Sequence, residues 1–129
     1  EKAVAEKPDA GLIRTALAHA QIETAGNDSS VLEKAIRNLL IAQKSEPKST
    51  RIHRLLATAY GRTGDESRAK LHLAEEALLQ NKLDYAGSLA REALKGLKSG
   101  SGDWIRANDI LGYIGVHKQD KNDDGDDQP

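Results

Sequence analysis

Histidine has a wide chemical range, because imidazole transfers protons near neutral pH and binds transition metals. The chain contains four histidines and no cysteine, so a metal site would depend on His, Asp or Glu ligands. No histidine belongs to an HEXXH segment or a comparable metal motif. His53 and His72 fall on different predicted helices, and no further ligand pattern joins them. We therefore expect surface or partly packed histidines, and no metal or other cofactor in this chain.

Arginine side chains could recognise carboxylates, because guanidinium pairs with them bidentately. Three arginines and a threonine recur at spacings of 3, 4 and 4 on one predicted helix, which places them on one stripe. Aligning Leu17-Ala18 with Leu56-Ala57 extends this stripe onto an earlier helix. The predicted stripe comprises Thr15, His19, Glu23, Arg51, Arg54, Thr58 and Arg62. It is either a groove that binds peptide carboxylates or a solvated basic face without a ligand. In the first case, replacing Arg54 and Arg62 with Glu abolishes binding.

Motifs for catalysis are absent from the sequence. There is no G-X-S-X-G segment, no Walker loop and no G-X-G-X-X-G segment, so we expect no catalytic residue. Asp120, Asn122, Asp124 and Gly125 fit the opening of an EF-hand loop. The glutamate of the twelfth loop position would lie beyond Pro129, so a disordered acidic tail is the favoured interpretation.

Composition favours helices. Ala, Leu, Lys, Glu and Arg supply 62 of the 129 residues, a share typical of long-helix and helical-repeat proteins. The net charge of the chain is -1. The last 14 residues contain five Asp and two Lys, so this segment alone has a net charge of about -3. The remainder is therefore about +2, too little for an electrostatic nucleic-acid binder. No apolar run approaches the roughly 18 residues of a membrane span.

Helical periodicity predicts six helices joined by short turns, which implies antiparallel neighbours. They are expected at about residues 9–25, 29–46, 51–63, 69–79, 84–97 and 103–114. Residues 1–8 are interpreted as a linker, 9–115 as the helical domain and 116–129 as the disordered tail.

An internal repeat indicates how these helices are arranged. Ala35, Leu39, Ala42 and Pro47 have offsets of 0, 4, 7 and 12, as in the second helix of the 34-residue tetratricopeptide (TPR) repeat. The fourth helix fits both the second helix of one repeat and the first helix of the next, which leaves the register open. We predict an all-α TPR-like array, an α-solenoid with a concave inner surface, over the alternative of a non-repeat helical bundle.

Longer stretches carry a family resemblance. R-I-H-R-L-L-A-T-A-Y-G-R-T-G-D, H-L-A-E-E-A-L-L, A-R-E-A-L-K-G-L and G-S-G-D-W-I-R-A-N-D-I-L resemble the C-terminal TPR region of BepA-like periplasmic zinc metallopeptidases, which contain HEXXH. The resemblance covers roughly residues 10–114. It implies a periplasmic location, a role in protein quality control, and zinc in a protease domain outside this chain.

These features together predict a non-catalytic protein-protein interaction module. The resemblance implies that it binds substrates or outer-membrane assembly partners, or docks on its own protease domain. Because the chain begins with Glu1, we expect it to be part of a longer protein. The alternative is a free-standing TPR scaffold with no protease attached. We further expect self-association through exposed end helices.

Overall fold

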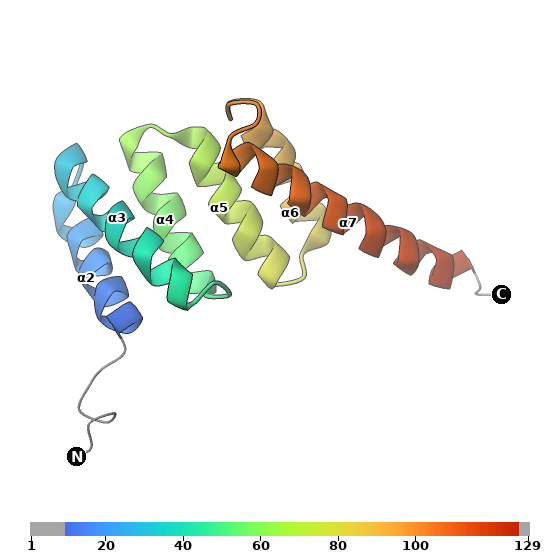
Figure 1. Ribbon diagram of the computed structural model, residues 1–129, viewed down its shortest axis with the longest axis horizontal. Coiled ribbons are helices and arrows are strands. Elements are labelled where there is room, and N and C mark those ends of the chain that lie inside the picture. The colour runs from blue at the N-terminus through green and yellow to red at the C-terminus, as the bar shows by residue number, and fades with distance from the viewer. Residues whose placement is uncertain (1–9, 127–129) are drawn as a thin grey trace, which may run out of the picture.

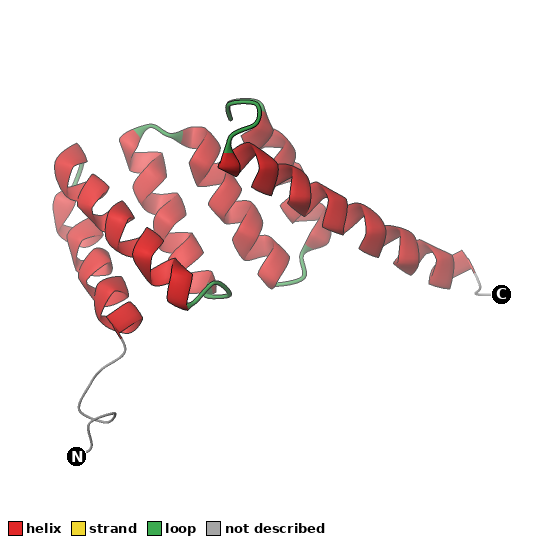
Figure 2. Cartoon of the chain, in the orientation of Figure 1, coloured by secondary structure: helices red, strands yellow, loops and turns green. Residues whose placement is uncertain are grey.

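The computed structural model describes residues 10–126, and the side chains of residues 10–118. The described part of the chain consists of six helices and contains no strand (Figure 2). The helices are α2 (Ala10–Ala25), α3 (Ser29–Ser45), α4 (Thr50–Thr63), α5 (Glu66–Leu79), α6 (Leu83–Leu94) and α7 (Gly102–Asp126). The prediction of an all-α array of six helices is confirmed. The linker predicted at residues 1–8 lies outside the described residues.

Short polar side chains begin three of the helices. Asp28 caps α3, Ser49 caps α4 and Asp65 caps α5, and each accepts a hydrogen bond from a backbone N–H of the first turn. Gly64 ends α4 with a φ of 90°, a left-handed conformation that favours glycine. The caps at Gly64 and Asp65 are adjacent, so α4 turns directly into α5.

Helix α6 ends at Leu94, three residues before the predicted end at Leu97. Leu97 still packs against the core from the bend that follows the helix. In this bend Gly96 lies so close to α5 that a Cβ atom would clash with the Ser67 hydroxyl. The chain leaves the helix before this bend, although the apolar spacing continues to Leu97.

The C-terminal helix is longer than predicted. Disorder was expected from residue 116, but α7 continues to Asp126. Figure 1 shows its second half projecting past α6, away from the rest of the array. Ile114 is its last buried residue among those whose side chains are described. The prediction was wrong for residues 116–126 because it took loss of apolar spacing for loss of helix. Residues 127–129 lie outside the described part.

The helices follow one another in space as they do in sequence (Figure 1). Each helix packs against the next, and two further contacts join α2 to α4 and α5 to α7. Among the described residues, α4 and α5 are the only helices that connect the first three helices with the last three. Helix α5 packs against both α4 and α6, which agrees with its double place in the repeat.

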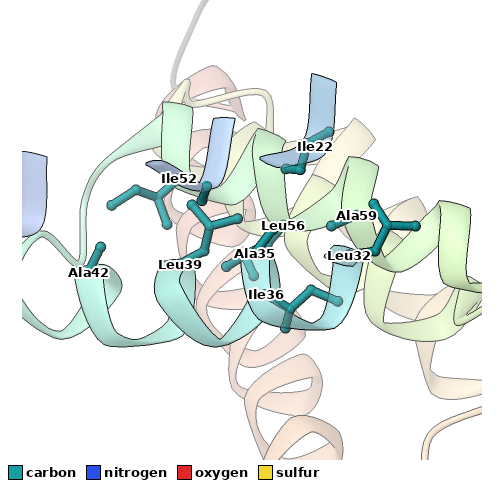
Figure 3. Packing of buried hydrophobic residues seen from close by; sticks show 10 residues of the cluster. Ile22, Leu32, Ala35, Ile36, Leu39, Ala42, Ile52, Leu56 and Ala59 are labelled. Atoms are coloured by element: carbon teal, nitrogen blue, oxygen red, sulfur yellow. The ribbon is translucent and has the colours of Figure 1, made fainter. Parts of the chain in front are cut away.

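The apolar core is divided at the same place. The first cluster uses residues of α2, α3 and α4, with Leu32, Leu39 and Leu56 fully buried (Figure 3). The second uses α5, α6 and α7, around Leu71 and Ile110. We call these parts the N-terminal module (α2–α4) and the C-terminal module (α5–α7), and the packing of α4 on α5 the junction.

Candidate functional site

The junction buries polar groups where the modules bury leucine and isoleucine. His53 of α4 is 3% exposed and His72 of α5 is 6% exposed. Their Nδ1 atoms are 3.0 Å apart, and their rings stack with centroids 5.3 Å apart. Tyr60 stacks on the other side of His72 at 5.6 Å. The two histidines were expected as separate residues, whereas the fold makes them a pair.

The protons of this pair follow from its geometry. One Nδ1 must donate to the other, so the donating ring has a bare Nε2 and the accepting ring carries its hydrogen on Nε2. Either histidine can be the donor, and in both arrangements one ring of the pair has an unprotonated Nε2.

Burial keeps both rings neutral. Desolvation is the main cause that lowers the pKa of His53 below its ordinary value of 6.5. Desolvation, with the charge of His53 as a second cause, lowers the pKa of His72 to about 4. Glu75 opposes both shifts without reversing either. A proton on either ring is therefore disfavoured as long as α4 and α5 remain packed.

The histidine pair lies at the base of a groove of about 740 Å³. Side chains from α3, α4, α5 and α7, and from the turn after α3, line it. They are Leu40, Gln43, Pro47, His53, Tyr60, Arg68, Leu71, His72, Glu75, Asp103 and Arg106. The groove thus spans both modules, and its width depends on how they meet at the junction.

Two arginines of the C-terminal module border the groove, and both form ion pairs. Arg106 of α7 donates two hydrogen bonds of 2.6 Å to the carboxylate of Glu75. Arg68 donates to Asp103 at 2.6 Å and to Asp65 at 2.7 Å. Both guanidinium groups are therefore already paired with carboxylates, and neither is a free site for an acidic ligand.

Gln43 is the exception in this otherwise satisfied site. Its Oε1 atom is buried without a hydrogen-bond partner, alone in this respect among the side chains of residues 10–118. A buried unpaired polar atom costs about 1–3 kcal/mol.

The structure brings part of the predicted stripe together but does not place Thr15 on it. His19 pairs with Glu23 at 3.1 Å, and Arg51 lies 3.2 Å from His19, so these three side chains do meet. Thr15 does not join them, because it is 3% exposed and its hydroxyl donates to the Gly11 carbonyl. The alignment with α4 missed that α3 covers this side of α2.

The remaining members of the predicted stripe are engaged within the protein. Arg54 pairs with Glu76 of α5 at 2.7 Å, and Arg62 donates to the Ile22 carbonyl at the end of α2. Thr58 donates to the Arg54 carbonyl one turn earlier. Arg54 and Arg62 therefore connect helices of the array. Whether the stripe binds a peptide stays a prediction.

Other surfaces give weaker signals. Leu12, Ile13 and Leu17 are about half exposed on the outer side of α2, where the prediction of self-association stays untested. The described residues contain no cluster of three or more His, Cys, Asp or Glu able to hold a metal. The EF-hand-like residues lie within α7, outside the described side chains. No helix in the described range is long and apolar enough to cross a membrane.

Comparison with known proteins gives no match to a family, to a curated protein or to a solved structure. The groove could not be predicted from the stripe, because the stripe was traced along two helices only. The lining of the groove comes from four helices, from Leu40 of α3 to Arg106 of α7. The one available signal was that His53 and His72 interrupt the apolar spacing of neighbouring helices.

Proposed function

We propose that this chain is a protein-interaction module that holds a segment of a partner polypeptide in the groove across the junction. The observation that carries the proposal is Gln43, a partly buried side chain whose Oε1 atom has no hydrogen-bond partner, in the wall of a groove of about 740 Å³. That volume falls within the roughly 300–1,000 Å³ usual for binding sites. A polypeptide backbone supplies the N–H donor that this amide lacks.

The lining suits a segment with both apolar and polar groups. Leu40 and the partly buried Tyr60 ring offer apolar contact, while the ion pairs at the border offer further hydrogen-bonding atoms. Since Arg68 and Arg106 are already paired, capture of a free carboxylate would cost one of these internal pairs. We therefore propose recognition through apolar contact and backbone hydrogen bonds, in place of the carboxylate binding expected from the predicted stripe.

Selection of random peptides tests this proposal. The wild-type chain would be used to enrich 12-residue peptides from a displayed library, and their dissociation constants would be measured. Leu40→Glu puts a charge into the groove, whereas Ile41→Glu puts the same charge on the same helix outside it. The two side chains are matched, with exposures of 37% and 45%. We expect Leu40→Glu to weaken binding at least tenfold and Ile41→Glu to change it less than threefold.

A third variant distinguishes the groove from the predicted stripe. Arg51→Glu reverses a charge on the stripe and leaves the groove untouched. Enriched peptides that lose affinity with Arg51→Glu and keep it with Leu40→Glu would contradict the groove and favour the stripe. Helical circular dichroism of every variant confirms that the array remains folded.

We propose, on the sequence resemblance alone, that the parent protein is a periplasmic zinc metallopeptidase with its HEXXH site in another domain. The groove would then hold a substrate or an assembly partner for that protein. The reading frame upstream of Glu1 tests this directly. An HEXXH segment after a secretion signal would support it, whereas a start codon just upstream would favour the free-standing scaffold.

A further inference from the structure

We infer that the contact between His53 and His72 is a proton-operated latch that holds α4 against α5 and so fixes the angle between the two modules. The inference goes beyond the proposed function, because the latch acts in the free chain whether or not the groove binds a polypeptide. It assigns a conformational role to two buried histidines that no catalytic or metal chemistry uses.

The first support is the construction of the junction. Each module has its own apolar cluster, and the described residues of the two modules meet only through α4 and α5. Ala57 and Ala69 are buried but belong to neither cluster. A Cβ atom on Gly61 would lie 4.0 Å from the Ala69 Cβ, so the helices approach closely through small residues. The larger side chains at this contact include the buried histidine pair and the partly buried Tyr60 that stacks on His72.

The second support is the connection that would allow movement. A single tight turn at Gly64-Asp65 joins α4 to α5, and Gly64 has a φ of 90°. No other chain crossing links the modules in the described range. A change in packing at the histidine pair would therefore alter the angle between two bodies whose own cores stay intact.

Protonation acts on this contact in two steps. A first proton adds to the bare Nε2 of the donating ring, which keeps the hydrogen bond intact but places a charge in a desolvated position. A second proton must add to Nδ1 of the accepting ring. Two N–H groups would then face each other across 3.0 Å, and the hydrogen bond would be lost. Water can solvate both cations only after α4 and α5 separate.

Charged groups around the pair do not cancel this effect. His72 faces His53 of α4, Glu75 and Arg68 of its own helix, and Asp103 of α7. His53 faces Glu75 and Glu76 of α5, and Arg106 of α7. Each of these three carboxylates is paired with an arginine: Glu75 with Arg106, Glu76 with Arg54, and Asp103 with Arg68. The carboxylates therefore offer little unbalanced negative charge to stabilise a protonated histidine.

Distance measurements between the modules test the latch. The chain has no cysteine, so two introduced cysteines carry spin labels without background. Lys44→Cys on α3 and Gly112→Cys on α7 report across the junction, and both positions are exposed. Ala20→Cys with Lys44→Cys reports within the N-terminal module as a control. Pulsed electron paramagnetic resonance would be recorded at pH 7.5, 5.5 and 4.0, with ring NMR following His72.

The latch predicts that the distance across the junction lengthens or broadens as both rings become protonated, which ring NMR of His53 as well as His72 would follow, while the control distance stays constant. In His53→Gln/His72→Gln the change should disappear, although every carboxylate is still present. If that variant is not helical, His53→Gln alone replaces it, because one remaining ring cannot give the second protonation. An unchanged junction distance after both rings have titrated would overturn the inference. So would an equal change in the Gln variant or in the control pair.

Discussion

At the scale of single residues, the histidine pair shows how the fold gives ordinary side chains new properties. Neither histidine is distinctive in sequence, yet the junction buries both and stacks one between the other and Tyr60. The buried neutral pair satisfies its own hydrogen bond within a contact that contains few large apolar side chains. Its contribution to stability therefore depends on pH.

We expect the free energy of unfolding to fall as the pH drops from about 6.5 toward 4. The pKa of His72 is about 4 in the folded chain and returns to its ordinary value of 6.5 on unfolding, so the unfolded chain binds more protons between these values. The difference corresponds to about 3 kcal/mol, fully present above pH 6.5 and lost as the pH falls through the folded pKa. Urea unfolding at pH 7.5 and 4.5 measures it. His53→Gln/His72→Gln should lose less stability over this range, and an equal loss in both proteins would contradict the assignment.

The ion pair between Arg106 and Glu75 gives a second prediction at this scale. Glu75 is 12% exposed and accepts two hydrogen bonds from one guanidinium, so Glu75→Gln should cost about 1–2 kcal/mol. Glu92→Gln is the matched control, because Glu92 is 49% exposed and meets only Lys95. It should cost less than about 0.5 kcal/mol. Equal costs in chemical denaturation would show that the bidentate geometry adds nothing.

The site could be predicted only in part from residue spacing. The alignment of Leu17-Ala18 with Leu56-Ala57 put His19 and Arg51 on one predicted stripe, and the structure brings these two side chains of α2 and α4 to 3.2 Å. Residue spacing could not show that Arg54 pairs with Glu76, or that Arg62 donates to the Ile22 carbonyl. These partners lie 22 and 40 residues away in the sequence. The histidine pair escaped for the same reason.

At the scale of helices, the turn between α4 and α5 depends on one glycine. Gly64→Ala should cost about 1 kcal/mol, because its φ of 90° is strained for any residue with a Cβ. Gly112→Ala introduces the same methyl group within α7, where nothing lies within 4 Å, and should stabilise the helix by several tenths of a kcal/mol. Thermal unfolding of both variants gives the comparison. A stabilising effect of Gly64→Ala would contradict the left-handed cap.

Helix positions were largely predictable because caps and apolar spacing act locally. Glycine favours the end of a helix and aspartate favours its beginning, and the structure uses Gly64 and Asp65 in these two roles. The end of α6 was predicted three residues too late, because the apolar spacing that indicated the helix continues to Leu97. The length of α7 was missed because an exposed polar helix has no apolar pattern that would indicate it.

At the scale of the whole molecule, two cores joined by one helix contact should respond separately to mutation. Leu39→Ala opens a cavity in the N-terminal module, and Ile110→Ala does so in the C-terminal module, where both side chains are completely buried. Each should cost about 2–5 kcal/mol. Hydrogen exchange should quicken mainly in α2–α4 for the first variant and in α5–α7 for the second. If hydrogen exchange quickened equally in all six described helices, the two modules would unfold together as one cooperative unit.

The groove that spans both modules is central to the proposed function, and one measurement tests it most directly. A ¹⁵N-labelled wild-type chain would be titrated with the most strongly enriched displayed peptide, and the shift changes of each backbone amide and histidine ring recorded. We predict the largest changes at Gln43, His72 and Arg106, on the two sides of the junction. Changes centred on His19, Arg51 and Thr58, with the groove silent, would contradict the proposal.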